Sequence, residues 1–379
     1  MKRTLQILGL ACLIAGLTVV EAQQGPTREG SETVAKPRRN PSETAKPDES
    51  QGEKIPSKFG KKKEGETQQE GTTFRSDATT VNVDVAVLDN KGRFIPGIPR
   101  GNFRVLEDNV PQTVSQFGTG EAPMTVVLVV EFSNLWQSYY SYTWYETLTA
   151  AYGFMESLKP EDYVAVVAYD MRPEVLTDFT TDKRVAYDAM RRLQIASYSE
   201  SNMYDALVYT IDRMQEIEGR KAIVLIASGW DTFSKLTFDK TRKALQNGGV
   251  PIYSIGIAQM MREYMDARGM MGPIARLDGL QADNTLRTFA KETGGMCFLP
   301  RFQGEYPSIF RSISDSLRNQ YSLAYQPTNQ TRDGKFRKIK VELVNPANGE
   351  PLKITDEKGK PLKYQIIAKA GYTAPREVE

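Results

Sequence analysis

The pattern of hydrophobic positions divides the chain into stretches with different periods. Between residues 81 and 87, valine alternates with a polar or small residue, and this period of two predicts a half-buried β-strand. Residues 102–117 continue with short strands around a turn at residues 107–109, without a helical period. Because a few isolated strands cannot form a stable core, we expect them to pair with strands elsewhere in the chain.

From Met124 onward the pattern changes. Continuous apolar runs rich in β-branched residues are typical of strands covered on both faces, and they occur at residues 126–130, 163–169, 222–227 and 250–257. Stretches with helical spacing lie between and after these runs, at residues 145–158, 185–193, 203–217, 240–247, 285–292 and 308–319. The alternation predicts an α/β domain with a mostly parallel, Rossmann-like sheet and helices on both faces.

Period-two patterning returns after residue 320. Residues 339–343 alternate apolar and charged side chains, and residues 321–325 and 364–368 have the composition of neighbouring strands. We therefore predict that an N-terminal β segment (residues 73–118) pairs with a C-terminal β segment (residues 321–375). Together they would form one small β-sandwich, with the α/β domain (residues 119–320) inserted between them.

The first residues have the features of an export signal. Two basic residues, an apolar run and a small residue before the cleavage position predict a signal peptide at residues 1–22. A lipoprotein leader ending at Cys12 is an alternative, but the apolar run continues beyond that cysteine. No other segment has the roughly 20 apolar residues of a membrane helix. We expect a chain without a transmembrane helix after cleavage, exported to the periplasm, the cell surface or the medium.

Residues 23–72 are rich in Lys, Glu, Pro, Gly, Gln, Ser and Thr, and Phe59 is their one aromatic residue. Such a composition buries too little apolar surface to offset the entropy of ordering, so we predict a disordered linker.

Composition excludes several kinds of chemistry. The chain has no histidine, which removes Ser-His-Asp and Cys-His catalysis and His-ligated zinc. The net charge of +2 comes from scattered basic residues, so nucleic acid is not an expected partner. Cys297 is the one cysteine outside the predicted leader, which leaves no partner for an internal disulfide. Its place in a predicted strand after two glycines favours packing over a nucleophilic role.

Residues 130–135, Val-Glu-Phe-Ser-Asn-Leu, end the first central strand, and here the sequence resembles the von Willebrand factor type A fold. Together with the segments 103–108, 204–207, 221–226 and 371–372, they are similar to a bacterial exported branch of the family, over roughly residues 74–375. The resemblance implies a metal-ion-dependent adhesion site. There an Asp-x-Ser-x-Ser sequence, a Thr from a later loop and an Asp after the fourth strand hold Mg²⁺.

Several of these ligand positions differ in this chain. Glu131 stands at the leading Asp and Leu135 at the second Ser, while Ser133 is kept. Ser201 falls at the Thr position and Ser228 at the later Asp, with Asp231 three residues beyond. Mg²⁺ requires carboxylate charge and near-octahedral geometry, so the resemblance implies a degenerate site without metal. Glu131, Ser133 and Ser201 would be its vestigial positions.

We therefore predict an exported, non-catalytic binding or scaffold protein that recognises a protein or cell-surface partner. The expected ligand-binding surface at the strand ends consists of Glu131, Ser133, Trp136, Ser201, Ser228, Trp230 and Asp231. Aromatic residues crowd residues 136–145, as at binding hot spots, or else pack under the following helix. The methionine-rich residues 260–271 predict a lid or a loose helix. Adhesion through an atypical Mg²⁺ site and a hydrolase using Ser228 stay open as alternatives.

Overall fold

A computed structural model describes residues 80–119, 123–133, 140–193, 198–217, 219–257, 259–355 and 359–376. The predicted signal peptide, the predicted linker, Leu135 and Trp136 lie outside the described residues. No helix among the described residues is long and apolar enough to cross a membrane.

The α/β part of the chain is built on a six-stranded sheet in the order β10-β9-β8-β5-β6-β7. Strands β5 (Met124–Glu131), β6 (Tyr163–Tyr169), β8 (Arg220–Ala227), β9 (Ile252–Gly256) and β10 (Cys297–Phe298) run parallel, and β7 (Pro173–Thr180) is antiparallel to β6. Every residue of β5 is buried, as its continuous apolar run predicts. The predicted α/β fold with a mostly parallel sheet is confirmed.

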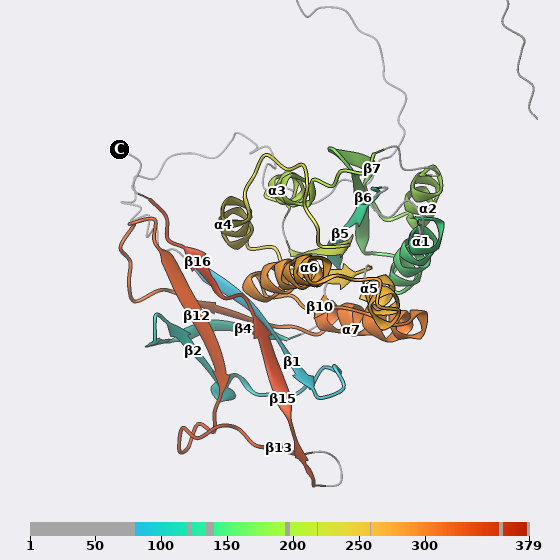
Figure 1. Cartoon of the computed structure of the whole chain (residues 1–379). Helices are drawn as coiled ribbons and strands as arrows, with labels where there is room; N and C mark the ends of the chain where they lie inside the picture. Colours follow the sequence, from blue (N-terminus) through green and yellow to red (C-terminus); the bar gives the residue numbers. More distant parts are fainter. Residues whose placement is uncertain are drawn as a thin grey trace, which may run out of the picture. The chain divides into compact units, whose positions relative to one another are not determined.

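Helices cover both faces of this sheet (Figure 1). The side chains of β5 alternate between the two faces. Val126, Leu128 and Val130 pack in one core with α1 (Tyr140–Glu156), α2 (Lys183–Arg191) and α7 (Tyr306–Arg318). Val127 and Val129 pack in the other core with α3 (Met203–Arg213), α4 (Phe238–Gly248) and α6 (Pro273–Thr293). Helix α5 (Gln259–Ala267) precedes α6, and short 3₁₀ helices lie at Arg100–Asn102 and Gln303–Glu305.

The strands outside the central sheet form antiparallel sheets that combine both ends of the described chain. One has the order β15-β1-β11-β4 and the other the order β16-β12-β2-β3, next to a two-stranded β13-β14 sheet. Their bounds are β1 Val81–Asp89, β2 Phe103–Glu107, β3 Val110–Gln112, β4 Val114–Thr119, β11 Tyr321–Tyr325, β12 Phe336–Leu343, β13 Ile354–Thr355, β14 Pro361–Leu362, β15 Tyr364–Ala368 and β16 Gly371–Thr373. Strand β1 pairs with β11 and β15, and β2 pairs with β12. The inward side chains of both four-stranded sheets share one hydrophobic core.

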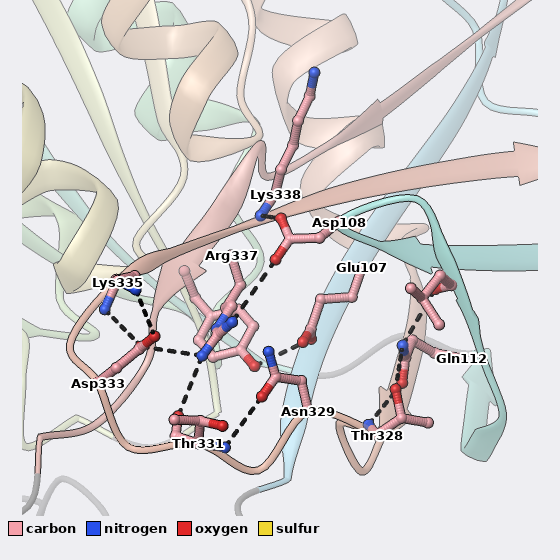
Figure 2. Close-up of polar contacts among 12 residues, drawn as sticks. Glu107, Asp108, Gln112, Thr328, Asn329, Thr331, Asp333, Lys335, Arg337 and Lys338 are labelled. Atoms are coloured by element: carbon pink, nitrogen blue, oxygen red, sulfur yellow. Dashed lines mark hydrogen bonds and ion pairs between the residues drawn. The ribbon is translucent and has the colours of Figure 1, made fainter.

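A buried polar cluster joins the two ends of the chain inside these sheets. One oxygen of Glu107 on β2 accepts hydrogen bonds from the hydroxyls of Tyr325 (2.7 Å) and Tyr372 (3.0 Å). Arg337 lies beside this cluster, and Figure 2 shows its guanidinium directed toward Asp108, Asp333 and Thr331. Glu107 is more than 200 residues away from both tyrosines in the sequence, so these two hydrogen bonds connect the N-terminal and C-terminal strands directly.

Several elements differ from the sequence predictions, among them β7 and the start of α6. Strand β7 was not predicted because an edge strand is half-exposed and lacks a continuous apolar run. The helix predicted at residues 285–292 is only the second half of α6, which begins at Pro273. The methionine-rich stretch, for which a lid or a loose helix was predicted, forms helix α5 followed by a turn, and buried Arg262 anchors this helix to α6. Cys297 is half-buried in β10, and burial raises the pKa of its thiol to about 12.

Candidate functional site at the strand ends

The candidate site lies where the parallel strands β5 and β8 end. Glu131 is the last residue of β5, and Ser228 directly follows β8. The segment before α3 contributes Ser201, because its backbone lies against the loop after β8. Parallel neighbours end at the same edge of a sheet, and ligands of open α/β sheets bind at this edge.

Glu131 ties the end of β5 to the loop after β8. Its Oε2 accepts hydrogen bonds from the backbone N–H of Ser228 at 2.6 Å and from the Ser228 hydroxyl at 2.7 Å. Its Oε1 accepts a hydrogen bond from the Ser133 hydroxyl at 2.8 Å. Burial raises the pKa of Glu131, while these serine hydrogen bonds act in the opposite direction. Both oxygens of this carboxylate are therefore engaged by donors of the protein itself.

Ser201 ties the segment before α3 to the same loop. Its hydroxyl donates to the carbonyl of Trp230 at 3.1 Å, and its backbone N–H donates to the Thr232 hydroxyl at 2.9 Å. In return, the backbone N–H groups of Thr232 and Phe233 donate to the carbonyl of Ser201 at 2.8 and 3.0 Å. Ser201 is completely buried, so its hydroxyl serves to connect the segment before α3 with the loop after β8.

Asp231 caps helix α3 from outside the helix. Its Oδ2 accepts from the backbone N–H of Tyr204, in the first turn of α3, at 2.8 Å. Ser234 donates to the same oxygen from its hydroxyl at 2.6 Å and to Oδ1 from its backbone N–H at 3.2 Å. The side chain of Asn202, at the N-cap position, makes no capping hydrogen bond, so Asp231 satisfies a donor that helix starts leave free. Burial raises the pKa of Asp231.

Tyr169 is a residue of this site that the sequence reasoning missed. It ends β6 directly beside Glu131 in the parallel register, and it is buried. Burial, followed by the charges of Glu131 and Asp231, raises the pKa of its phenol well above the usual value. Its hydroxyl lacks a partner in hydrogen-bond geometry among the described residues. Its position at the end of the predicted strand at residues 163–169 is the signal by which it could have been found in the sequence.

The α5–α6 hairpin adjoins this site through Arg262. The Arg262 guanidinium lies over the Trp230 ring, 5.2 Å from its centre, and also donates to the carbonyl of Gly279 at 3.1 Å and pairs with Asp283. Gly229 has a positive φ of 88°, and a Cβ there would lie 2.6 Å from the carbonyl oxygen of Ala282. Only glycine allows the loop to pack this closely on α6, so loop and hairpin form one continuous scaffold.

The first turns of α6 carry an exposed apolar stripe. Ile274, Leu277 and Leu280 recur every three residues and are 77%, 56% and 66% exposed. Met270, in the turn before the helix, is 57% exposed. We call these four residues the α6 stripe. Their spacing after Pro273 is a helical signal in the sequence. The predicted helix nevertheless begins only at residue 285, twelve residues after the observed start of α6.

The predicted site residues within the described chain come together, but they do not all face outward. Glu131, Ser133, Ser201, Ser228, Trp230 and Asp231 belong to one hydrogen-bonded junction of three segments. Glu131, Ser201 and Ser228 are buried, whereas Ser133, Trp230 and Asp231 are half-exposed. Among the described residues, no group of three or more Asp, Glu, Cys or His side chains is placed to hold a metal ion.

Residues 126–230, which span β5 to the loop after β8, match the family model of the von Willebrand factor type A domain. This part of the chain is a type A domain. Its bounds include Glu131, Ser133, Ser201 and Ser228, so the type A region contains most of the junction. A search of curated proteins found no match to the chain.

Several solved structures are similar to part of this chain. The von Willebrand factor domain of the type V pili tip protein Mfa5 from Porphyromonas gingivalis is 14% identical, with 52% of this chain and 95% of that chain covered at a TM-score of 0.40. A von Willebrand factor type A protein from Catenulispora acidiphila is 13% identical, with 78% and 75% covered at a TM-score of 0.40. Proximal thread matrix protein 1 from the mussel byssus is 10% identical at a TM-score of 0.40, with 52% of this chain and 49% of that chain covered. This chain therefore spans about half the length of the mussel protein.

Proposed function

We propose that this protein is an exported, non-catalytic binding protein whose type A domain holds a protein partner without a metal ion. The partner would dock on the α6 stripe and on the adjoining half-exposed residues Ser133, Trp230 and Asp231. The observation that carries this proposal is the stripe itself, because large apolar side chains gathered on one exposed helix face mark interaction sites.

The hairpin that carries the stripe is well anchored, which suits a binding surface. Arg262 holds α5 to α6 through Gly279 and Asp283 and covers the ring of Trp230. A rigid surface loses little conformational entropy when a partner binds, so the apolar contact contributes more of its free energy to affinity. Half-exposed Trp230 at its margin is a residue type enriched at binding hot spots.

The hydrogen bonds that the carboxyl oxygens of Glu131 and Asp231 accept support metal independence. Ser228 and Ser133 donate to Glu131, while Tyr204 and Ser234 donate to Asp231. Burial raises the pKa of both carboxyls, and this shift favours the uncharged form. A divalent ion needs charged oxygens that are free to coordinate it, so this donor set does not fit Mg²⁺. In our proposal, direct hydrogen bonds, in place of a bound metal ion, join the three segments of the junction.

The hydrolase alternative finds little support at Ser228. Its hydroxyl donates to Glu131 at 2.7 Å and accepts from the backbone N–H of Trp230 at 3.3 Å. The residue is only 2% exposed, so a substrate does not reach this oxygen without rearrangement of the loop. The chain has no histidine to activate it.

Site-specific photocrosslinking in the producing cells tests the proposal. A photoreactive amino acid replaces Leu277, and as a matched control it replaces Val185, which is 48% exposed on α2 in the opposite helix layer. We expect a protein adduct at position 277, unchanged by EDTA and lost on adding Leu280→Asp, and no such adduct at position 185. Equal adducts at both positions would refute the docking surface, and loss of the adduct with EDTA would refute metal independence. An adduct between two copies of the chain would make the occupant a second copy.

A further inference from the structure

A cationic groove lies between the type A domain and the antiparallel sheets, away from the strand-end junction. Its volume is about 710 Å³, within the range of ligand sites. Residues of β12 and β15 line it on the side of the antiparallel sheets, and α6 and β10 line it on the side of the type A domain. The backbone N–H of Ala370 donates to the carbonyl of Glu292 at 3.1 Å, which holds the two sides together.

Close backbone packing fixes the base of this groove. Gly294, at the end of α6, has a φ of 85°, and a Cβ there would lie 2.6 Å from the backbone nitrogen of Lys369. Any other residue would push the two sides apart, so the groove has a defined width. Met296, Phe298 and Ile366 add apolar lining.

The groove has an excess of positive charge without matching carboxylates. Arg287, Lys291, Lys338 and Lys369 line it, and their side chains have no ion-pair partner among the described residues. Lys340 also lines it and pairs with Glu342 at 2.7 Å. The carboxylate in the lining, Asp89, is already paired with Arg93 at 2.7 Å. A ligand that supplies carboxylates would therefore meet cations that the protein itself leaves unpaired.

Lys369 is the most enclosed of these cations. Burial lowers the pKa of its ammonium group, and the charge of Asp84 only partly opposes this effect. Asp84 itself accepts a hydrogen bond from the Ser322 hydroxyl at 2.7 Å. An anion in the groove would compensate the desolvation of Lys369.

The walls of the groove are edges of β-sheets. Strand β15 is the terminal strand of its sheet. The register of β12 with β16 ends at Lys338, and beyond it the backbone N–H of Ile339 donates to Ala370 and the carbonyl of Leu343 accepts from Leu352. Between these two contacts, residues 340–342 of β12 pair with β2. Sheet edges bind extended peptides by adding a strand.

We propose that this groove binds an extended acidic peptide segment, in which glutamate or aspartate alternates with apolar residues. The backbone of the peptide pairs with the edge of β15, and its carboxylates lie against Arg287, Lys291, Lys338 and Lys369. Its apolar side chains contact Met296, Phe298 and Ile366. An anionic polysaccharide or free phosphate offers neither a strand backbone nor apolar side chains, so the lining favours a peptide.

The test uses the full chain and a labelled ten-residue peptide of alternating glutamate and valine. Its control peptide carries glutamine in place of glutamate. The double variant Arg287→Glu, Lys291→Glu changes two exposed side chains of the groove, and the control Lys243→Glu reverses an exposed charge on α4, outside the lining. We expect saturable binding by fluorescence anisotropy, a Kd at least about tenfold weaker for the double variant, and a change below about twofold for Lys243→Glu. Hydrogen exchange of residues 364–368 is expected to slow when the peptide binds.

Three results would overturn the proposal. Equal binding of the glutamine peptide would remove the role of the carboxylates. An unchanged Kd in the double variant would place the peptide elsewhere on the chain. Displacement of the peptide by inorganic phosphate or a sulfated polysaccharide at equal charge concentration, without protection of residues 364–368, would assign the groove to a different anion. None of these measurements depends on the α6 stripe.

Discussion

Replacing Glu131 with alanine removes the carboxylate that joins the end of β5 to the loop after β8. The backbone N–H of Ser228, which donates to it at 2.6 Å, then has no acceptor in a buried position. Leaving a buried donor unsatisfied costs about 1–3 kcal/mol. The hydroxyls of Ser228 and Ser133 lose partners at 2.7 and 2.8 Å. We expect the free energy of unfolding to fall by about 3–4 kcal/mol in total, once lost packing is included.

Two further variants separate the parts of this effect. Ser133→Ala removes one donor and leaves both Ser228 contacts in place, so its expected cost is about 1 kcal/mol. Glu131→Gln keeps the size of the side chain and an acceptor oxygen for the Ser228 N–H, but it does not titrate. Its stability therefore gives a baseline for the titration of Glu131.

The sign of the pH dependence follows from the raised pKa of Glu131. Above the ordinary value of 4.5 the unfolded chain loses this proton while the folded chain keeps it. The stability that Glu131 contributes is thus complete below that value and is lost as pH rises through the raised folded pKa. Relative to Glu131→Gln, the free energy of unfolding of the native protein should fall with pH, by at most about 1.4 kcal/mol per pH unit.

Urea unfolding between pH 4 and pH 8, followed by tryptophan fluorescence and circular dichroism, measures these differences. A loss below about 1 kcal/mol for Glu131→Ala would show that the junction does not depend on this carboxylate. A difference between the native protein and Glu131→Gln that stays level or rises with pH would refute burial as the dominant influence on Glu131.

Further predictions concern the metal, the loop and the antiparallel sheets. Adding Mg²⁺ or EDTA should leave the melting temperature unchanged, whereas a metal present at 100 times its Kd would stabilise by about 2.7 kcal/mol and be visible by calorimetry. Asp231→Ala should cost about 1–2 kcal/mol in urea unfolding because α3 loses its cap, and a neutral result would contradict the capping role. Gly229→Ala should destabilise by more than about 1 kcal/mol because of its positive φ and the carbonyl of Ala282 at 2.6 Å; wild-type stability would contradict the close packing. The raised pKa values of Tyr325 and Tyr372 predict that stability is lost as pH rises above their ordinary value of 10.0, and Tyr325→Phe should lessen that loss in alkaline urea titrations.

The sequence by itself determined the class of the fold and the chemical character of the strand ends. Strands buried on both faces need apolar side chains at every position, so β5, β6 and β8 are visible as continuous runs. The resemblance to the type A fold also singled out Glu131, Ser133, Ser201 and Ser228. Residues that end parallel strands or precede the next helix meet at one edge of the sheet, so side chains at such positions come together.

The tertiary structure decided what these side chains contact. The sequence shows Glu131 at the position of the leading Asp, but the distance between the ends of β5 and β8 determines that its carboxyl group reaches Ser228. The exposure of the α6 stripe likewise depends on where α6 leaves the core near Gly279. Helical spacing of apolar residues is the same in a buried and an exposed turn, so only the packing of neighbouring elements distinguishes them.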